Sequence, residues 1–242
     1  MKIGIISDIH SNIDALKAVL NEFDKNNIEK IICCGDIIGI GAFPEETVQL
    51  LLKKKDKLIA VRGNHEQYLL NGLPKEIHDN KRAMSQNEIQ NHKWTHSQLS
   101  DVSIKFLSSL PVKIFMEIEN KKLYVVHYPL EDDNTYKKHI KNPNLRDSRL
   151  LFSNINADIF LFGHNHTYGI NSEKNNIYIN PGSIGCPMSN NVAHAVMLNI
   201  SNKKVDFKHI EVEYDTKAVI KKIQKMKFPF YDSILKIFYG QN

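Results

Sequence analysis

The sequence predicts an α/β fold built on a layered sheet. Short apolar runs rich in β-forming residues recur along the chain, and each is followed by glycine or polar residues. Two segments with helical spacing of apolar residues lie between the first three runs, which gives the order β-α-β-α-β. With 42% hydrophobic and 24% charged residues, the 242-residue chain can bury a core, and wholesale disorder is excluded.

The first strand is predicted over residues 2–7. The helix after it is indicated by apolar residues at helical spacing, namely Ile13, Leu16, Val19, Leu20 and Phe23. A second helix is predicted over 45–54, and the remaining strands over 30–34, 58–61, 123–127 and 158–162. Runs of this kind suit strands that are buried on both faces.

From residue 67 to about 110 the strand pattern disappears. Polar, helix-compatible segments take its place at 80–82, 86–90 and 97–106. We interpret 67–110 as a helical cap inserted into the domain, where substrate choice would be encoded.

Alternation returns after the glycine-rich run 180–185. The segments 193–200 and 205–212 predict an antiparallel pair, and 215–242 is predicted to be a helical tail. No internal repeat or low-complexity linker interrupts the chain, so we expect one domain over 1–242 that carries the cap and the tail.

The tail is rich in aromatic residues: Phe228, Phe230, Tyr231, Phe238 and Tyr239. Left in water they would form an apolar patch. We expect the tail to pack on its own domain, with packing on a second subunit of a homo-oligomer as the alternative.

Charge and cysteine content suggest the compartment. The net charge is +5 without a long Lys/Arg block, so neither nucleic acid nor a membrane surface is an expected partner. The first apolar stretch ends at Asp8, too soon for a secretory or membrane-spanning segment, and we expect a cytoplasmic protein. Cys33, Cys34 and Cys186 cannot all pair, and we expect buried thiols in a reducing compartment.

Each of the five predicted strands ends in residues typical of metal ligands. The motifs are Asp8-Ile9-His10, Gly35-Asp36, Gly63-Asn64-His65-Glu66, His127 and Gly163-His164-Asn165-His166. Because open α/β sheets bind ligands at the carboxyl ends of their strands, these motifs should converge on one crevice. A single motif of this kind would be interpreted as a polar strand end or a turn. The five motifs in order, with their carboxylates, imidazoles and amide, predict a site for divalent metal.

The remaining histidines are interpreted as surface or packing residues, with substrate contact by one of them as the alternative. They are His78, His92, His96, His139, His194 and His209.

The motifs resemble those of the calcineurin-like metallophosphoesterases, and the resemblance runs from Lys2 to about Val212. Residues 35–41, Trp94-Thr95 before Leu110-Pro111, and 180–183 look like the bacterial and archaeal phosphodiesterase group labelled diadenosine-tetraphosphatase-like. The resemblance implies an α/β/β/α four-layer sandwich of two mixed sheets flanked by helices.

The resemblance also implies two divalent metal ions, Mn²⁺ first, with Fe, Ni, Co or Zn as alternatives. The implied ligands are Asp8, His10 and His166 for one ion, Asn64, His127 and His164 for the other, and Asp36 bridging both. A hydroxide shared by the ions would attack phosphorus, and His65, beside Asn64 but outside the ligand set, would protonate the leaving oxygen. The expected function is hydrolysis of a small phosphate mono- or diester, with a nucleotide among the candidates.

Two departures from related patterns matter. Protein serine/threonine phosphatases of this superfamily read Gly-Asp-x-x-Asp-Arg-Gly, whereas here Gly39 replaces the second Asp and no Arg follows. This removes a partner that would orient His65, and protein phosphatase activity is not expected. Close relatives often read His-Gly-Ser-Pro where this chain has Tyr128 after His127, so Tyr128 would narrow the mouth of the site or contact substrate.

Several other residues each have two interpretations. Asn12 is interpreted as a helix N-cap, with substrate contact as the alternative. Arg62 would bind a phosphate or lie on the surface, and the charged loop 137–139 would be solvated or steer substrate. Trp94 would pack in the cap or stack on a base.

Two alternative functions stay open. A nuclease should carry a basic groove, but the positive residues are scattered among acids. A non-catalytic metal-binding scaffold is the second alternative, because a retromer subunit with this fold has lost catalysis. The presence of His65 and of all the expected ligands favours an enzyme.

Overall fold

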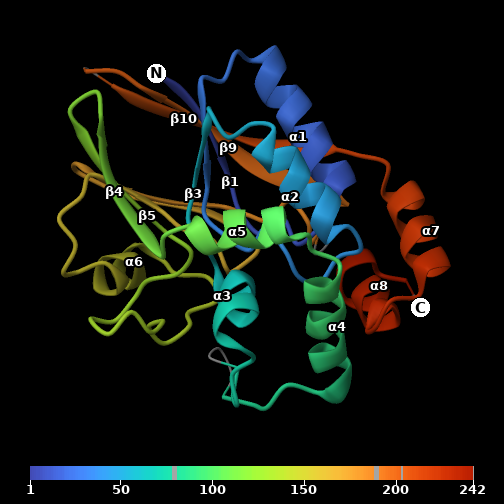
Figure 1. The fold of residues 1–242 in the computed structure, drawn as a ribbon. Helices are drawn as coiled ribbons and strands as arrows, with labels where there is room; N and C mark the ends of the chain where they lie inside the picture. The colour runs from blue at the N-terminus through green and yellow to red at the C-terminus, as the bar shows by residue number, and fades with distance from the viewer. Residues whose placement is uncertain (78–80, 188–190, 203, 242) are drawn as a thin grey trace.

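The computed structural model describes residues 1–77, 81–187, 191–202 and 204–241, arranged around two five-stranded sheets (Figure 1). The first sheet has the order β10-β9-β1-β2-β3. Its strands are β1 (Lys2–Ile6), β2 (Lys30–Cys33), β3 (Leu58–Ala60), β9 (Val192–Ile200) and β10 (Val205–Glu213). Strands β1, β2 and β3 are parallel, and β9 and β10 form the predicted antiparallel pair.

The second sheet has the order β4-β5-β6-β8-β7. Its strands are β4 (Lys113–Ile118), β5 (Lys121–Val126), β6 (Ile159–Leu161), β7 (Tyr168–Glu173) and β8 (Asn176–Pro181). Strands β5, β6 and β8 are parallel, and the edge strands β4 and β7 pair antiparallel with their neighbours.

Side chains that alternate along the strands separate the layers. Ile3 and Ile5 of β1 lie in the core between the two sheets with Val125 of β5, whereas Ile6 belongs to the core under the helices of the first sheet. Those helices are α1 (Ile13–Lys25) and α2 (Pro44–Leu52), and α6 (Leu145–Leu151) covers the outer face of the second sheet. The predicted helix-sheet-sheet-helix sandwich is confirmed.

Three strands and one helix were not predicted. Strands β4 and β7 are sheet edges with mixed polar and apolar residues, so neither has the continuous apolar run of a central strand. The apolar part of β8 is only three residues long, Ile177 to Ile179, and the strand ends in Asn180 and Pro181, which are residues typical of turns. Helix α6 has seven residues, too few for a periodic pattern.

The region expected to be a helical cap contains most of α3 (Asn64–Asn71), and all of α4 (Gln86–Ser97) and α5 (Asp101–Ser109). The segment 97–106 spans two helices, because the Ser100 hydroxyl caps a new one at the Ser103 amide. The helical expectation at 80–82 is wrong for Arg82, which forms an isolated β-bridge with Ile77, and Asn80 lies outside the described residues.

The tail forms α7 (Thr216–Met226) and α8 (Tyr231–Tyr239). Phe228 and Tyr239 are buried, and the Phe228 ring stacks on Trp94 of α4 with centroids 4.8 Å apart. Figure 1 shows α8 beside α4. The tail therefore packs on its own chain, and Trp94 is used in that packing.

The three cysteines are buried free thiols, as predicted. Within the described residues, no helix has the length and apolar character needed to cross a bilayer.

Candidate metal centre

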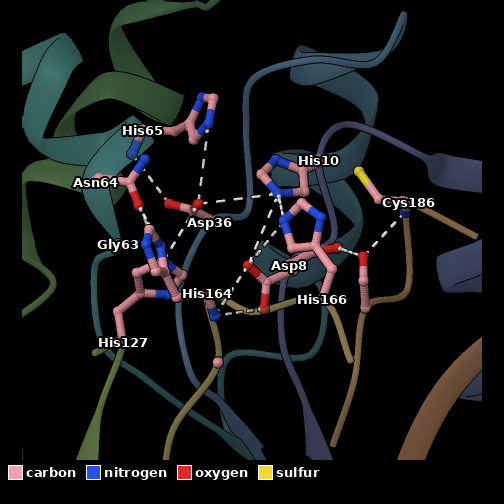
Figure 2. Close-up of polar contacts among 12 residues, drawn as sticks. Asp8, His10, Asp36, Gly63, Asn64, His65, His127, His164, His166 and Cys186 are labelled. Atoms are coloured by element: carbon pink, nitrogen blue, oxygen red, sulfur yellow. Dashed lines mark hydrogen bonds and ion pairs between the residues drawn. The ribbon is translucent and has the colours of Figure 1, made fainter. Parts of the chain in front are cut away.

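The structure brings all the predicted ligand side chains together at one edge of the two sheets (Figure 2). Asp8 and His10 follow β1, Asp36 follows β2, and Asn64 opens α3 just after β3. From the second sheet, His127 follows β5, and His164 and His166 follow β6. The carboxyl ends of parallel strands thus meet where the two sheets adjoin.

Asp36 lies at the centre of the cluster and is 2% exposed. Its Oδ2 is 3.2 Å from Nε2 of His127 and 3.8 Å from Nε2 of His10. Its Oδ1 accepts a hydrogen bond from the backbone amide of His65 at 2.9 Å. Burial alone would raise the pKa of Asp36, but the surrounding imidazoles, His127 foremost, outweigh burial and hold the pKa below its usual range.

One group of side chains lies on the Asp8 side of Asp36. The Oδ1 atom of Asp8 is 3.7 Å from Nε2 of His10 and 3.4 Å from Nε2 of His166. The two Nε2 atoms of these histidines are 2.9 Å apart. Burial opposes ionisation of Asp8, yet hydrogen bonds from His10 and His166 keep its pKa well below the ordinary value.

A second group lies on the other side of Asp36. The Oδ1 atom of Asn64 is 3.1 Å from Nε2 of His127 and 3.1 Å from Nδ1 of His164. Those two nitrogens are 3.2 Å apart. Burial disfavours the charged form of His127, but Asp36 and Asp8 outweigh it and raise the pKa of His127 to about 9.

The donor atoms of both groups fit divalent cations. Ligand atoms about 2.1 Å from one ion lie about 3.0–3.4 Å from one another in octahedral or tetrahedral geometry. The separations of 3.1–3.2 Å in the second group fall within that spacing, and those of 2.9, 3.4 and 3.7 Å in the first group lie around it. Imidazole nitrogens, carboxylate oxygens and an amide oxygen are ligands that first-row divalent metals accept.

Cys186 lies beside the first group. Its Sγ and one ring nitrogen each of His10 and His166 all lie within 4.8 Å of one another. The sequence predicts only a buried thiol at Cys186, because this cysteine has none of the spacings typical of metal-binding cysteines.

The backbone at the ligands is strained. Asp8, His10, Asp36, His164 and His166 have φ values between 45° and 71°, a left-handed region that side chains with a Cβ avoid. Strain of this kind persists where surrounding contacts over-determine the loop, as at functional sites. Close approach also requires glycine nearby, since a Cβ on Gly63 would overlap Oδ1 of Asp36.

Glu66 is a site residue to which the sequence analysis gave no role, although it completes the Gly63-Asn64-His65-Glu66 motif. It is fully buried, and its carboxylate accepts hydrogen bonds from the backbone amides of Asp36, Ile37, Ile38 and Gly63 at 2.7–3.1 Å. The side chain ties the loop after β2 to the start of α3, so it holds Asp36 and Asn64 in register. The signal in the sequence was a Glu three residues into a helix that follows Gly63.

His65 lies at the edge of the cluster, and one of its ring nitrogens, one of His10 and a carboxylate oxygen of Asp36 all lie within 4.8 Å of one another. Its Nε2 is 3.9 Å from Oδ2 of Asp36, and its buried Nδ1 has no hydrogen-bond partner among the described residues. Burial lowers the pKa of His65 well below its usual value, and His10 and His92 contribute to this although Asp36 opposes it.

The His92 ring centroid is 5.0 Å from that of His65. His92 is therefore a buried packing residue, one of the predicted alternatives, and the ring that it packs against belongs to His65 at the cavity wall.

The three predicted substrate contacts have different positions. Asn12 is 4% exposed, and its side chain caps α1 through the Ala15 amide, as the N-cap interpretation predicts. Tyr128 is fully buried, and its ring centroid is 5.1 Å from that of His164. Tyr128 therefore packs behind this predicted metal ligand and does not narrow the mouth of the site. Arg62 is half-buried and is not among the described residues that line the cavity at the site.

The charged loop is tied to the protein. Lys137 Nζ donates to the Leu151 carbonyl at 2.7 Å, and His139 Nε2 is 2.6 Å from Oδ1 of Asn165. The first contact joins the loop to the end of α6, and the second joins it to the segment after β6 that carries His164 and His166.

A cavity of about 360 Å³ opens over the cluster. Asp36, Asn64, His164 and His166 form its floor, and His65 lies beside them. Its walls come from α3 and α4, the segment between them, and α8. A small ligand bound over the floor would be enclosed by the cap and the tail.

Comparison with known proteins gives the same family as the motifs. The family described as the calcineurin-like phosphoesterase superfamily domain matches residues 1–203. A Methanocaldococcus jannaschii protein, uncharacterized protein MJ0912, is 33% identical in an alignment 249 residues long, gaps included, that covers 94% of this chain and 93% of that one. A probable metallophosphoesterase of the same organism, MJ0623, is 28% identical over 190 residues, 77% of this chain and 70% of its own.

Solved structures share the fold. A metallophosphoesterase from Sphaerobacter thermophilus superposes with a TM-score of 0.75 at 24% identity, covering 99% of both chains. The hypothetical protein PH1004 from Pyrococcus horikoshii has a TM-score of 0.78 at 20% identity, covering 98% of this chain and 97% of its own. With the motifs, the convergent ligand cluster and the sandwich all in agreement, the chain belongs to the calcineurin-like phosphoesterase superfamily.

Proposed function

We propose that this protein hydrolyses a small phosphate mono- or diester at a centre of two divalent ions, with Mn²⁺ as the first candidate. The observation that carries the proposal is the position of Asp36 between two groups of ligand-type side chains. One group contains His10 and the other His127, and both imidazoles face the same Asp36 oxygen.

Two bound ions would supply a shared water of lowered pKa as the nucleophile, and positive charge against the phosphoryl oxygens. The protein's part is to hold the ligands in one orientation. Nδ1 of His127 lies 2.8 Å from the Cys34 carbonyl and donates to it, so Nε2 is the nitrogen that would hold an ion once its own proton is displaced.

His65 is the proposed proton donor to the leaving oxygen. Its lowered pKa makes the imidazole neutral at pH 7 in the free protein. A phosphate anion beside it would favour the charged form and raise the pKa again, so the proton would be taken up as substrate binds. Its position at the cavity wall, outside both ligand groups, supports this role.

The cavity supports a small substrate. A volume of about 360 Å³ between the cap and α8 suits one ester with a compact organic group. The proposal therefore excludes a nucleic acid strand as the substrate.

The test is an activity screen with added Mn²⁺ on protein stripped of metal by chelation. The panel contains phosphomonoesters, phosphodiesters and dinucleoside polyphosphates, and the Asp36→Asn variant is the control. We expect Mn²⁺-dependent release of product from at least one mono- or diester, lost in the variant. Turnover that is independent of added metal, or no turnover on any ester, would overturn the proposal.

A further inference from the structure

The cavity continues from the metal centre into an apolar compartment between the cap and α8. We propose that this compartment is the subsite for the organic group of the ester, and that it accepts a flat or apolar group carrying no further phosphate. The inference rests on the proposed phosphoesterase function and names the class of its substrate.

Apolar side chains form the compartment from both sides. The cap and the loop after β2 contribute Ile77, Met84 and Ile40, and the tail contributes Phe230, Ile237 and Phe238. The Phe238 ring centroid is 6.2 Å from that of His166, so the apolar wall begins beside a ligand. Ile237 is 51% exposed and lines the same cavity, so this wall presents an accessible aliphatic side chain to a bound ligand.

The tail side of this wall is fixed in place. The Asn91 side chain of α4 donates to the Pro229 carbonyl at 2.9 Å, and the Asn12 side chain donates to the Tyr239 hydroxyl at 3.1 Å. Between these anchors, Phe230 has a φ of 73°, a left-handed conformation that residues with a side chain avoid. Two anchors and a strained residue keep a preformed surface against the cavity.

The charge of the compartment excludes a polyphosphate. Among the described residues that line the cavity, Arg82 is the only lysine or arginine, and its Nη1 is 2.8 Å from Oε2 of Glu88. The pair is neutral as a unit, whereas a second phosphate needs an arginine or lysine that is not already balanced by a carboxylate. This argues against a dinucleoside polyphosphate, despite the name of the group that the motifs resemble.

One polar atom adds a specific feature to the compartment. Nδ1 of His92 is buried and has no hydrogen-bond partner among the described residues. A heteroatom on a flat organic group would satisfy it, because a buried polar atom without a partner is costly.

The test measures binding by calorimetry, with three non-hydrolysable probes and the Mn²⁺-loaded protein. Phenylphosphonate carries a flat apolar group, methylphosphonate lacks it, and 1,4-phenylenediphosphonate adds a second anion at the far side of the ring. We expect phenylphosphonate to bind about 10- to 100-fold more tightly than methylphosphonate. The diphosphonate should lose that advantage.

Two substitutions on α8 locate the subsite. Phe238→Ala should remove most of the difference between phenylphosphonate and methylphosphonate while leaving methylphosphonate affinity within about twofold of wild type. Ile237→Ala tests the same wall at an exposed position where folding is not at risk, and melting temperatures verify both proteins. Lys236→Ala, an exposed change on the same helix away from the cavity, should alter neither affinity.

Equal affinities for the phenyl and methyl probes, in a protein that hydrolyses esters, would overturn the subsite alone. Tighter binding of the diphosphonate would overturn the charge argument and point to a polyphosphate substrate. No binding of any probe, together with no ester hydrolysis, would overturn the proposed function as well.

Discussion

Gly39 lies directly against the imidazole of His65, so closely that a Cβ atom at position 39 would overlap Nδ1 of the ring. Nδ1 is buried and has no hydrogen-bond partner among the described residues. Where the protein phosphatase pattern has a carboxylate, this chain holds the imidazole by packing, with His10 and His92 at ring-centroid distances of 4.9 and 5.0 Å.

This packing predicts that Gly39→Ala displaces His65. The methyl group would push the ring from its place, so kcat/KM should fall by on the order of 100-fold while metal content stays at the wild-type level. Gly72→Ala is the matched control, because Gly72 also has positive φ but has nothing within 4 Å of a Cβ. Both variants share the backbone strain, so wild-type activity in Gly39→Ala would contradict the packing role.

The central position of Asp36 predicts how metals are lost. Asp36→Asn removes the charge that both ligand groups face, so both metal affinities should weaken, by at least the roughly 10- to 100-fold typical of supporting residues. His164→Ala removes a ligand from one group only and should chiefly empty one position. Elemental analysis after dialysis distinguishes them, and an Asp36→Asn protein that keeps two tightly held ions with full turnover would refute the shared role.

Glu66 predicts a structural effect on the same centre. In Glu66→Gln an NH₂ group replaces one oxygen of a carboxylate that accepts four backbone amides, so N–H groups would face one another. We expect a loss of about 2–4 kcal/mol in the free energy of unfolding of the metal-free protein.

Chemical denaturation measures this loss. Glu119→Gln, in the exposed turn between β4 and β5, should change stability by less than about 0.5 kcal/mol. Equal stability of the two variants would show that the carboxylate does not hold the loops.

The sequence was most informative where chemistry and strand pattern coincide. Asp8, Asp36 and His127 each follow a buried apolar run, so both the strand and the site could be predicted from the same residues. Edge strands β4 and β7 lack such an apolar run. Whether these segments form strands depends on their pairing with neighbouring strands and not on a local pattern.

The supporting residues were harder to predict for a physical reason. Glu66 and His92 act through contacts with loops that are distant in the sequence, and nothing local distinguishes them from a helix-start glutamate or a histidine packed far from the site. The division of the strands into two sheets also depends on long-range pairing. The motif resemblance supplied it, because periodicity alone indicated only a layered α/β arrangement.

His92 predicts a pH dependence of stability. Burial lowers the pKa of His92 from 6.5 to about 4, and His96 contributes. Between pH 6.5 and 4, the His92 imidazole is protonated in the unfolded chain but neutral in the folded protein. The contribution of His92 to the free energy of unfolding is therefore complete above pH 6.5 and is lost as the pH falls towards 4.

Denaturation of the metal-free protein measures this dependence. Between pH 7.5 and 5, wild type should lose about 2 kcal/mol more than His92→Gln does. The same loss in both proteins would show that other groups set the acid sensitivity.

The role of His65 predicts a dependence on the leaving group. A proton donor matters only when the departing oxygen is a poor leaving group, as in an alkyl ester. A nitrophenyl ester departs as a stabilised anion and needs no proton. His65→Asn should therefore slow alkyl esters by roughly 10²–10⁴-fold and affect nitrophenyl esters much less, with the fold and metal content unchanged.

The competing hypothesis is that His65 binds metal or only shapes the pocket, and the same measurement separates the two. Nε2 of His65 is 3.9 Å from Oδ2 of Asp36, close enough that ligation is a real alternative. Ligation predicts similar losses for alkyl and nitrophenyl esters, together with altered metal content. The measurement is the ratio of wild-type to variant kcat/KM, taken once for the alkyl ester and once for the nitrophenyl ester. Only the alkyl ester needs a proton on its leaving oxygen, so equal ratios for the two esters would refute the proton-donor role.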